Sequence, residues 1–404
     1  MLNLSRIFKI VVDLPQQLGR PLSKTYIPEL DGLRFVALIV VLFWHASIRA
    51  ARYHENNANT NGFYFSFPHG EIGVLLFFFI SGYVVAQPFL SKPSDEWNIK
   101  YFYICRFIRI YPPYLISISL CFFLLQVIGH VPSNANAWNN NSISLVSSYF
   151  ASAFYLHSFI FDVPSRLNPP IWSLELEIIF YAIAPLLIFF YIKVRSKQKR
   201  VITLCIAILG LFLLTTYFSF HHQIDGRFRW GLLVHGYLFL LGILACDVAP
   251  DFFKKYKNKS FSFDIFSLLG FGCFLIIGLY MTQYDARLPT GWLTFLMQLS
   301  ITLSIIFVFL GSLYGTASSY FLSLSWVRLI GTMCYSIYLT HIVTMQATAE
   351  IANKIFSIDD PLLVWAVWIF ILIPASIIVG AIFYIVVEKP FYNAARKVRI
   401  SGAN

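Results

Sequence analysis

The sequence predicts an all-α polytopic membrane protein with about ten transmembrane helices and with both its N- and C-termini in the cytoplasm. Of its 404 residues, 58% are hydrophobic and only 12% are charged, whereas soluble domains carry about 25% charged residues. Apolar runs long enough to cross a bilayer recur along the whole chain. This composition excludes an ordinary soluble enzyme, a disordered chain and a secreted disulfide scaffold.

Residues 1–28 precede the first apolar run and are predicted to be a cytoplasmic leader. They contain Pro15, Pro21 and Pro28 together with four basic residues, so they lack the uninterrupted apolar segment of a cleavable signal peptide. Two conformations remain open for this leader. It is either disordered, or it forms an amphipathic helix on the membrane surface through the apolar residues Leu4, Ile7, Phe8 and Val11.

A transmembrane domain is predicted over residues 29–392, followed by a basic cytoplasmic tail at 393–404. We expect its spans at about 33–49, 72–90, 109–129, 172–192, 201–219, 231–249, 263–282, 291–313, 327–349 and 362–387. A further run, 143–161, is weaker because it contains several serines and His157. We interpret it as part of a long external loop, with a re-entrant segment or a full span as the alternatives.

The distribution of positive charge predicts the orientation of the spans. With ten crossings and both termini inside, 23 of the 30 lysines and arginines fall in cytoplasmic segments, as the positive-inside rule requires. A full span at 143–161 would turn the later basic runs outward. The same rule accounts for the net charge of +11 without a nucleic-acid partner.

The six cysteines are scattered in or beside the apolar runs and form no CxxC pair. They are most simply small buried hydrophobic residues. We therefore expect neither a disulfide framework nor a metal site.

His45 lies about halfway across the first predicted span. It follows Arg34 by 11 residues, which corresponds to roughly 16 Å of helix. An imidazole at that depth needs a hydrogen-bonding partner or a wet cavity, and such groups often mark functional sites. The alternative is a packed histidine that holds two helices together.

Arg106 and Arg109 lie at the cytoplasmic end of the third predicted span. Their i, i+3 spacing places them on one helix face. Two guanidinium groups on one face suit phosphate, because each presents a planar fork of donors to anionic oxygens. The alternative is ordinary anchoring of the helix end at the lipid headgroups.

Glu175 and Glu177 lie in the first turns of the fourth predicted span. Side chains at i and i+2 point in different directions on a helix, so the two carboxylates are not a catalytic dyad. One of them can face the interior of the bundle while the other lies at the interface. The alternative is a first-turn carboxylate that the helix dipole stabilises.

A polar seam is predicted in the ninth span. Tyr335 and Tyr338 share one helix face, and His341 continues that face at the next i+3 step. The seam either lines a cavity or joins neighbouring helices by hydrogen bonds.

Six segments, in this order, resemble signature motifs of the acyltransferase-3 family of membrane-bound O-acyltransferases. The resemblance covers about residues 28–392, with Leu75 and Cys105 standing where the family often has Asp and Arg. Because the chain ends about a dozen residues after Phe391, we expect a stand-alone member without the SGNH esterase-like domain of many bacterial relatives. The six segments are Glu29–Phe35 followed by His45, Gly73–Tyr83, Arg106–Pro112, Ile171–Tyr181, Tyr335–His341 and Val387–Phe391.

The resemblance implies an O-acetyltransferase of the cytoplasmic (inner) membrane. Its expected donor is acetyl-CoA, used as a substrate, with no permanently bound cofactor and no metal. The expected acceptor is a sugar hydroxyl of a cell-surface or lipid-linked glycan, such as an O-antigen or exopolysaccharide. A separate periplasmic acyl-transfer protein is a further candidate partner.

The resemblance also suggests roles for particular residues. Arg34, Arg106 and Arg109 are the candidate donor-binding residues. His45 is the candidate catalytic residue, either as a general base or as a transient acyl carrier, and Glu177 is the candidate to orient or charge-balance His45 or an arginine. The candidates for the acceptor path, or for a structural role, are Trp172, Ser173, Tyr338 and His341.

A secondary transporter or lipid-glycan flippase is the alternative function. Transporters often contain inverted repeats, and no internal repeat is evident in this sequence. The two functions differ in a simple observable, because only the enzyme releases free CoA thiol from acetyl-CoA.

Overall fold

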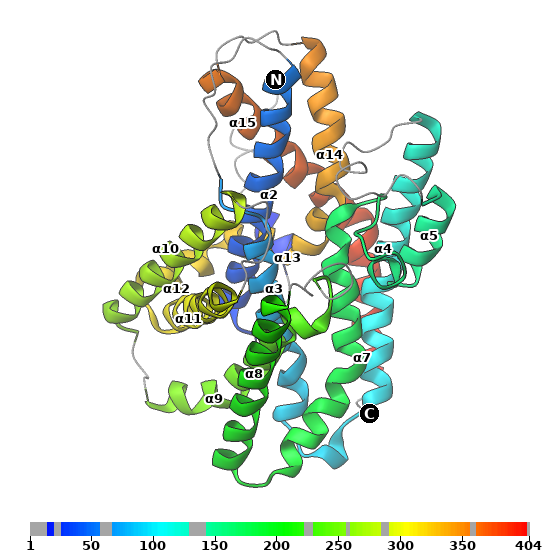
Figure 1. Cartoon of the computed structure of the whole chain (residues 1–404). Coiled ribbons are helices and arrows are strands. Elements are labelled where there is room, and N and C mark those ends of the chain that lie inside the picture. Colours follow the sequence, from blue (N-terminus) through cyan, green and yellow to red (C-terminus); the bar gives the residue numbers. More distant parts are fainter. Residues whose placement is uncertain are drawn as a thin grey trace.

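The computed structural model describes residues 14–19, 26–56, 67–128, 143–221, 229–255, 259–283, 291–355 and 361–401. Within these ranges every regular element is a helix (Figure 1). Most of the predicted leader, including its four apolar positions, lies outside the described residues. Residues 393–401 of the predicted tail continue the last helix.

The long helices are α2 (Pro28–Asn56), α3 (Glu71–Leu90), α4 (Ile99–Ile128), α7 (Trp172–Lys193), α8 (Lys197–Phe220), α9 (Leu232–Lys255), α10 (Phe261–Gln283), α11 (Trp292–Tyr314), α14 (Cys334–Ile355) and α15 (Pro361–Phe383). Shorter helices connect them: α5 (Leu145–Ala153), α6 (His157–Phe161), α12 (Ala317–Ser323), α13 (Ser325–Thr332) and α16 (Lys389–Ser401). Single turns occur at η1 (Ser94–Glu96), η3 (Pro169–Ile171) and η4 (Tyr384–Glu388), the last of which is a π-helical turn.

Nine helices in the described part of the chain are long and apolar enough to cross a membrane, so the prediction of an all-α polytopic membrane protein is confirmed. The predicted span at 327–349 is not one continuous helix, because α13 ends at Thr332 and α14 begins at Cys334. Helix α14 is 22 residues long. It is not among the nine, because the polar seam and several threonines lower its hydropathy.

The weak apolar run at 143–161 folds as two short helices. Helix α5 has nine residues and α6 has five, whereas a span needs about 20. His157 is buried between them, where its ring contacts the Ser148 hydroxyl at 3.1 Å and the Val163 carbonyl at 2.9 Å. Burial lowers the pKa of His157 to about 4, so its imidazole is neutral at physiological pH. This run is therefore a pair of short helices and not a full membrane span.

Helix α3 lies at the centre of the bundle and packs closely against α9. Thirteen of its 20 residues are buried. A Cβ atom on Gly82 would lie 2.1 Å from the Phe239 carbonyl oxygen, so a glycine is needed for this approach of the two backbones. Small residues allow this kind of contact between helices in a membrane.

Replacing Gly82 with valine is expected to destabilise the bundle, because the two helices must separate to admit the side chain. Overpacking of this kind costs about 1–3 kcal/mol or more. Thermal unfolding of the purified protein in detergent would measure the change, with Gly272→Val as the matched control because no atom lies within 4 Å of a Cβ built on Gly272. Equal melting temperatures for the two variants would contradict this packing argument.

Helix α2 packs against α13 and runs beside α14 in the same direction (Figure 1). Near one end, the Thr332 hydroxyl donates to the Asp31 carboxylate at 3.3 Å. Further along both helices, the rings of His45 and His341 are in contact. The backbones approach closely at Gly331, where a Cβ atom would lie 1.8 Å from the Asp31 carbonyl oxygen. This pairing brings the two predicted histidines together.

Candidate active site

The centre of the site is a pair of imidazoles. His45 Nδ1 lies 3.2 Å from His341 Nε2, and the ring centroids are 4.9 Å apart. His45 projects from α2 and His341 from α14, so the pair depends on residues nearly 300 positions apart in the chain. His341 is fully buried and His45 is partly exposed.

The hydrogen bonds around the pair determine which nitrogen atoms carry protons when both rings are neutral. His341 Nδ1 lies 2.7 Å from the Tyr338 carbonyl oxygen, which can only accept, so His341 Nδ1 is the donor and His341 Nε2 is unprotonated. His45 Nδ1 lies 3.0 Å from the Val41 carbonyl oxygen and faces the unprotonated His341 Nε2. Both neighbours are acceptors, so His45 Nδ1 carries the proton and His45 Nε2 keeps its lone pair.

A third histidine, which the sequence analysis did not single out, lies near this pair. The His69 ring packs in a tilted arrangement against Trp44, the residue before His45, with ring centroids 4.4 Å apart. Its Nδ1 accepts the Glu71 backbone N–H at 3.2 Å. Burial and the nearby Arg229 cation lower the pKa of His69 to about 3. The His69 imidazole is therefore neutral. Only its tertiary contact with Trp44 shows that it lies beside the site.

The polar seam of α14 joins this helix to three others. The Tyr335 hydroxyl donates to the Ile110 carbonyl of α4 at 2.8 Å. The Tyr338 hydroxyl lies 2.9 Å from the Ser173 hydroxyl of α7 and 2.8 Å from the Pro170 carbonyl. His341 completes the seam by its contact with α2. Three of the residues suggested for the acceptor path or a structural role are thus connected, and all three are buried.

Trp172, the fourth of these candidates, packs in an aromatic cluster. Its ring centroid lies 4.8 Å from that of Trp230, 5.5 Å from that of His235 and 6.1 Å from that of Phe78. The side chain is buried, so it stabilises the junction of α3, α7 and α9. Among the described residues its ring contacts join it to this cluster and not to the imidazole pair.

Glu177 is connected to Arg106 and not directly to His45. The hydroxyls of Ser81 and Tyr181 both donate to the Glu177 carboxylate. The Arg106 guanidinium lies over the Tyr181 ring, 4.2 Å from its centroid, in a cation–π contact. Of the two roles suggested for Glu177, charge balance of an arginine is therefore the one with a structural connection.

Glu175 points to the other side of α7, as the i, i+2 spacing predicted. One of its carboxylate oxygens accepts the Ser158 backbone N–H at 2.9 Å. The carboxylate is buried and holds the short helix α6 against the bundle. Glu175 and Glu177 thus contact different neighbours, Glu175 a residue of α6 and Glu177 a residue of α3.

The other two candidate donor-binding residues are Arg34 on α2 and Arg109 on α4. Arg34 forms an ion pair with Asp31 at 2.6 Å, and this carboxylate also accepts the Tyr26 hydroxyl at 2.9 Å. The Arg109 guanidinium lies 5.4 Å from the centroid of the Tyr392 ring of α16. Arg106 and Arg109 therefore contact different helices, although both lie on α4.

No group of three or more His, Cys, Asp or Glu side chains within the described ranges is arranged to hold a metal ion. The chemistry that the site offers comes from imidazole, hydroxyl and guanidinium groups. A partly exposed imidazole with a free lone pair can remove a proton from a hydroxyl group, or it can attack an activated carbonyl carbon.

Fold and site together define a polytopic membrane protein with a pair of hydrogen-bonded histidines between two of its helices. Residues 27–385 match the family model described as an acyltransferase domain. The chain therefore belongs to this acyltransferase-3 family, as its motifs indicated. No solved structure matches the chain.

Curated relatives support the same family. The chain is 26% identical over 391 residues to the peptidoglycan O-acetyltransferase OatA of Listeria monocytogenes, covering 91% of this chain and 56% of the relative. It is 26% identical over 408 residues to the putative peptidoglycan O-acetyltransferase YrhL of Bacillus subtilis, covering 93% and 57%. It is 27% identical over 340 residues to the O-acetyltransferase OatA of Staphylococcus aureus, covering 81% and 52%. The chain thus spans about half the length of these relatives.

Proposed function

We propose that this protein is a membrane O-acetyltransferase that moves an acetyl group from cytoplasmic acetyl-CoA to a sugar hydroxyl of a cell-envelope glycan. The observation that supports it best is the His45–His341 pair, which leaves His45 Nε2 unprotonated inside a membrane bundle. Both termini lie in the cytoplasm in this proposal, and the protein resides in the inner membrane. The positive charge of the predicted cytoplasmic segments supports this orientation.

In the proposed reaction His45 acts as general base. Its Nε2 takes the proton of the acceptor hydroxyl while the hydroxyl oxygen attacks the thioester carbonyl carbon. The carbon–sulfur bond then breaks, and the thiolate of CoA leaves and takes up the proton. His341 keeps the proton of His45 on Nδ1 by accepting its hydrogen bond, so that Nε2 faces the reactants.

A two-step route uses the same lone pair. In this route His45 Nε2 attacks the thioester carbonyl, the CoA thiolate leaves, and an acyl-imidazole forms. The acceptor hydroxyl oxygen then attacks this intermediate, the carbon–nitrogen bond breaks, the hydroxyl proton passes to the CoA thiolate, and the neutral imidazole is regenerated. To distinguish the routes, the protein is incubated with acetyl-CoA in the absence of acceptor, the reaction is quenched, and the mass of the protein is measured. Only the second route leaves an acetyl group on His45.

The proposal is tested by thiol release from acetyl-CoA by the purified protein in nanodiscs, with and without glycan. The names of the curated relatives make peptidoglycan fragments the first acceptor to test. Glycan-dependent release that is absent in His45→Ala supports the enzyme. If folded protein in intact nanodiscs releases no thiol under any condition, the transporter alternative gains support.

Arg106→Ala and Arg109→Ala are expected to raise the KM for acetyl-CoA more than the KM for the acceptor. A lost hydrogen bond to a charged group weakens binding by about 10-fold. Initial rates of thiol release at varied donor concentration measure this, with Arg195→Ala as a control in the connection between α7 and α8. An unchanged donor KM in both variants would exclude Arg106 and Arg109 as phosphate-binding residues.

A further inference from the structure

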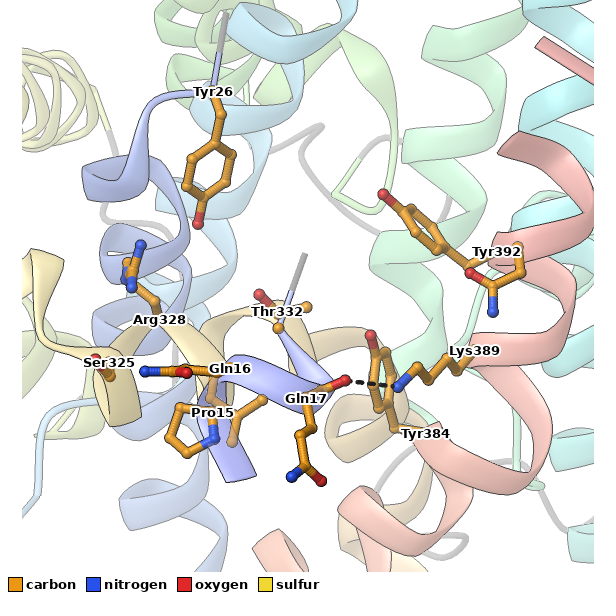
Figure 2. A pocket seen from close by; sticks show the side chains of 13 residues that line it. Pro15, Gln16, Gln17, Tyr26, Ser325, Arg328, Thr332, Tyr384, Lys389 and Tyr392 are labelled. Atoms are coloured by element: carbon orange, nitrogen blue, oxygen red, sulfur yellow. Dashed lines mark hydrogen bonds between the residues drawn. The ribbon is translucent and has the colours of Figure 1, made fainter. Parts of the chain in front are cut away.

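A cavity of about 450 Å³ lies between the described part of the leader, α13, η4 and α16. Two cationic side chains, Arg328 and Lys389, line it, together with the hydroxyls of Tyr26, Thr332 and Tyr392. Figure 2 shows Arg328 and Lys389 on opposite sides of the cavity. The volume lies within the usual range of small-molecule sites. Neither Arg328 nor Lys389 was among the candidate donor-binding residues.

The electrostatics of this cavity favour an anion. No Asp or Glu is among the residues that line it. On one side, the Tyr26 and Thr332 hydroxyls that line the cavity donate to the Asp31 carboxylate, which is paired with Arg34 at 2.6 Å. On the opposite side, the Glu388 carboxylate is buried and accepts the Ser336 hydroxyl at 2.6 Å, so it does not line the cavity. Arg109 adds a further positive charge behind Tyr392.

Arg328 is the side chain best placed to bind such an anion. Within the described residues no carboxylate forms an ion pair with it, and its Nε atom is buried without a hydrogen-bond partner. An unsatisfied buried donor costs free energy that a bound acceptor would recover. Lys389 donates to the Gln17 backbone carbonyl at 3.1 Å (Figure 2), which uses one of its three N–H donors.

The cavity lies near the first turn of α2 and the junction of α13 with α14, and helices α2 and α14 carry the imidazole pair. Thr332 lines the cavity at the end of α13, and His341 follows nine residues later, beyond the break between α13 and α14. Asp31, behind the cavity wall, precedes His45 by 14 residues, or roughly 21 Å. A ligand that fills both places needs an anionic end and a reactive group separated by a long flexible chain.

From this geometry we infer that the cavity binds the phosphate-bearing nucleotide end of the acyl donor, with Arg328 and Lys389 as its phosphate ligands. This inference rests on the proposed function. Arg328 presents a planar fork of donors to phosphate oxygens, and Lys389 supplies a point charge. The acyl chain of the donor then extends along α2 and α14 toward His45. An anionic lipid headgroup offers the same phosphate chemistry, and the experiment separates the two sources.

The test measures binding of adenosine 3′,5′-bisphosphate to the full-length protein in phosphatidylcholine nanodiscs by calorimetry. Arg328→Gln and Lys389→Gln are each expected to raise the Kd about 10-fold. Lys397→Gln is the matched control, because Lys397 lies on α16 two turns beyond Lys389 and is exposed. It removes the same charge and is expected to leave the Kd unchanged. Melting temperatures without nucleotide verify that the variants are folded.

Four results would overturn the inference. An equal effect of all three substitutions would indicate general surface charge instead of a site. Nucleotide binding that is unchanged in Arg328→Gln and Lys389→Gln, while wild-type protein still transfers acetyl groups, would remove this site and leave the proposed function standing. If Arg328→Gln and Lys389→Gln retain less bound phosphatidylglycerol than the wild type but keep their affinity for the nucleotide, the cavity binds a lipid headgroup and not the nucleotide. If wild-type protein neither binds the nucleotide nor releases thiol, the proposed function fails together with the site.

Discussion

Replacing His45 with alanine is expected to abolish detectable acetyl transfer, while the amount of protein in the membrane stays near normal. Loss of a positioned general base lowers a rate by about 10²- to 10⁴-fold, and loss of an acyl-carrying imidazole would be at least as severe. The expected effect is large because His45 Nε2 is the unprotonated imidazole nitrogen that the hydrogen bonds of the pair leave free. Thiol release and acetyl-glycan formation, measured together in nanodiscs, give the rate.

His221→Ala is the matched control for this variant. His221 lies exposed at the end of α8, far along the chain from either helix of the imidazole pair. The same substitution there is expected to leave transfer unchanged. Transfer at the wild-type rate in His45→Ala would exclude His45 both as base and as acyl carrier. A reduced amount of folded His45→Ala protein would instead indicate that the histidine holds α2 and α14 together.

Replacing His341 with alanine is expected to lower kcat by about 10²-fold, less than the loss of His45 itself, with little change in the donor KM. In this variant His45 Nδ1 loses the acceptor on α14 and keeps only the Val41 carbonyl. The imidazole can then rotate or exchange its proton between the two nitrogens, so Nε2 faces the reactants for a smaller fraction of the time. Steady-state rates of thiol release at saturating donor give kcat.

His341→Gln separates an orienting role from a purely structural one. The amide oxygen of glutamine can accept the proton of His45 Nδ1, so this variant is expected to recover a substantial part of the kcat that alanine loses. If the alanine and glutamine variants have equally low kcat and normal melting temperatures, acceptance of that hydrogen bond is not what His341 contributes. A rise in donor KM with unchanged kcat would place His341 in binding.

Much of the site was recognisable in the sequence because an ionisable residue in an apolar run is costly and therefore conspicuous. His45 and His341 were identified on this basis, whereas the division between Glu175 and Glu177 followed from their i, i+2 spacing on a helix. The contact between the two histidines was not predicted. Glu177 was considered as a partner of His45 or of an arginine, and the structure connects it to Arg106 through Tyr181. That choice depends on which face of α7 meets α3 and α4.

The residues that the sequence analysis missed share a different property. His69 precedes α3, Arg328 lies in the short helix α13, and Lys389 begins α16. Outside the long apolar runs charged and polar residues are common and carry no special signal. Their significance comes from neighbours that are distant in the chain. His69 matters because its ring packs against Trp44, and Arg328 and Lys389 matter because η4, α13 and the leader enclose one cavity.

By itself, the sequence determined that this protein is a helical membrane protein of the acyltransferase-3 family and where most of its spans lie. These properties depend on local composition, because each span must satisfy its own backbone hydrogen bonds and bury apolar side chains in lipid. The tertiary structure alone decided the break between α13 and α14, the His45–His341 pair and the cationic cavity beside Thr332. Each of these depends on how closely two helices approach and which faces they turn to each other, and packing between distant segments determines both.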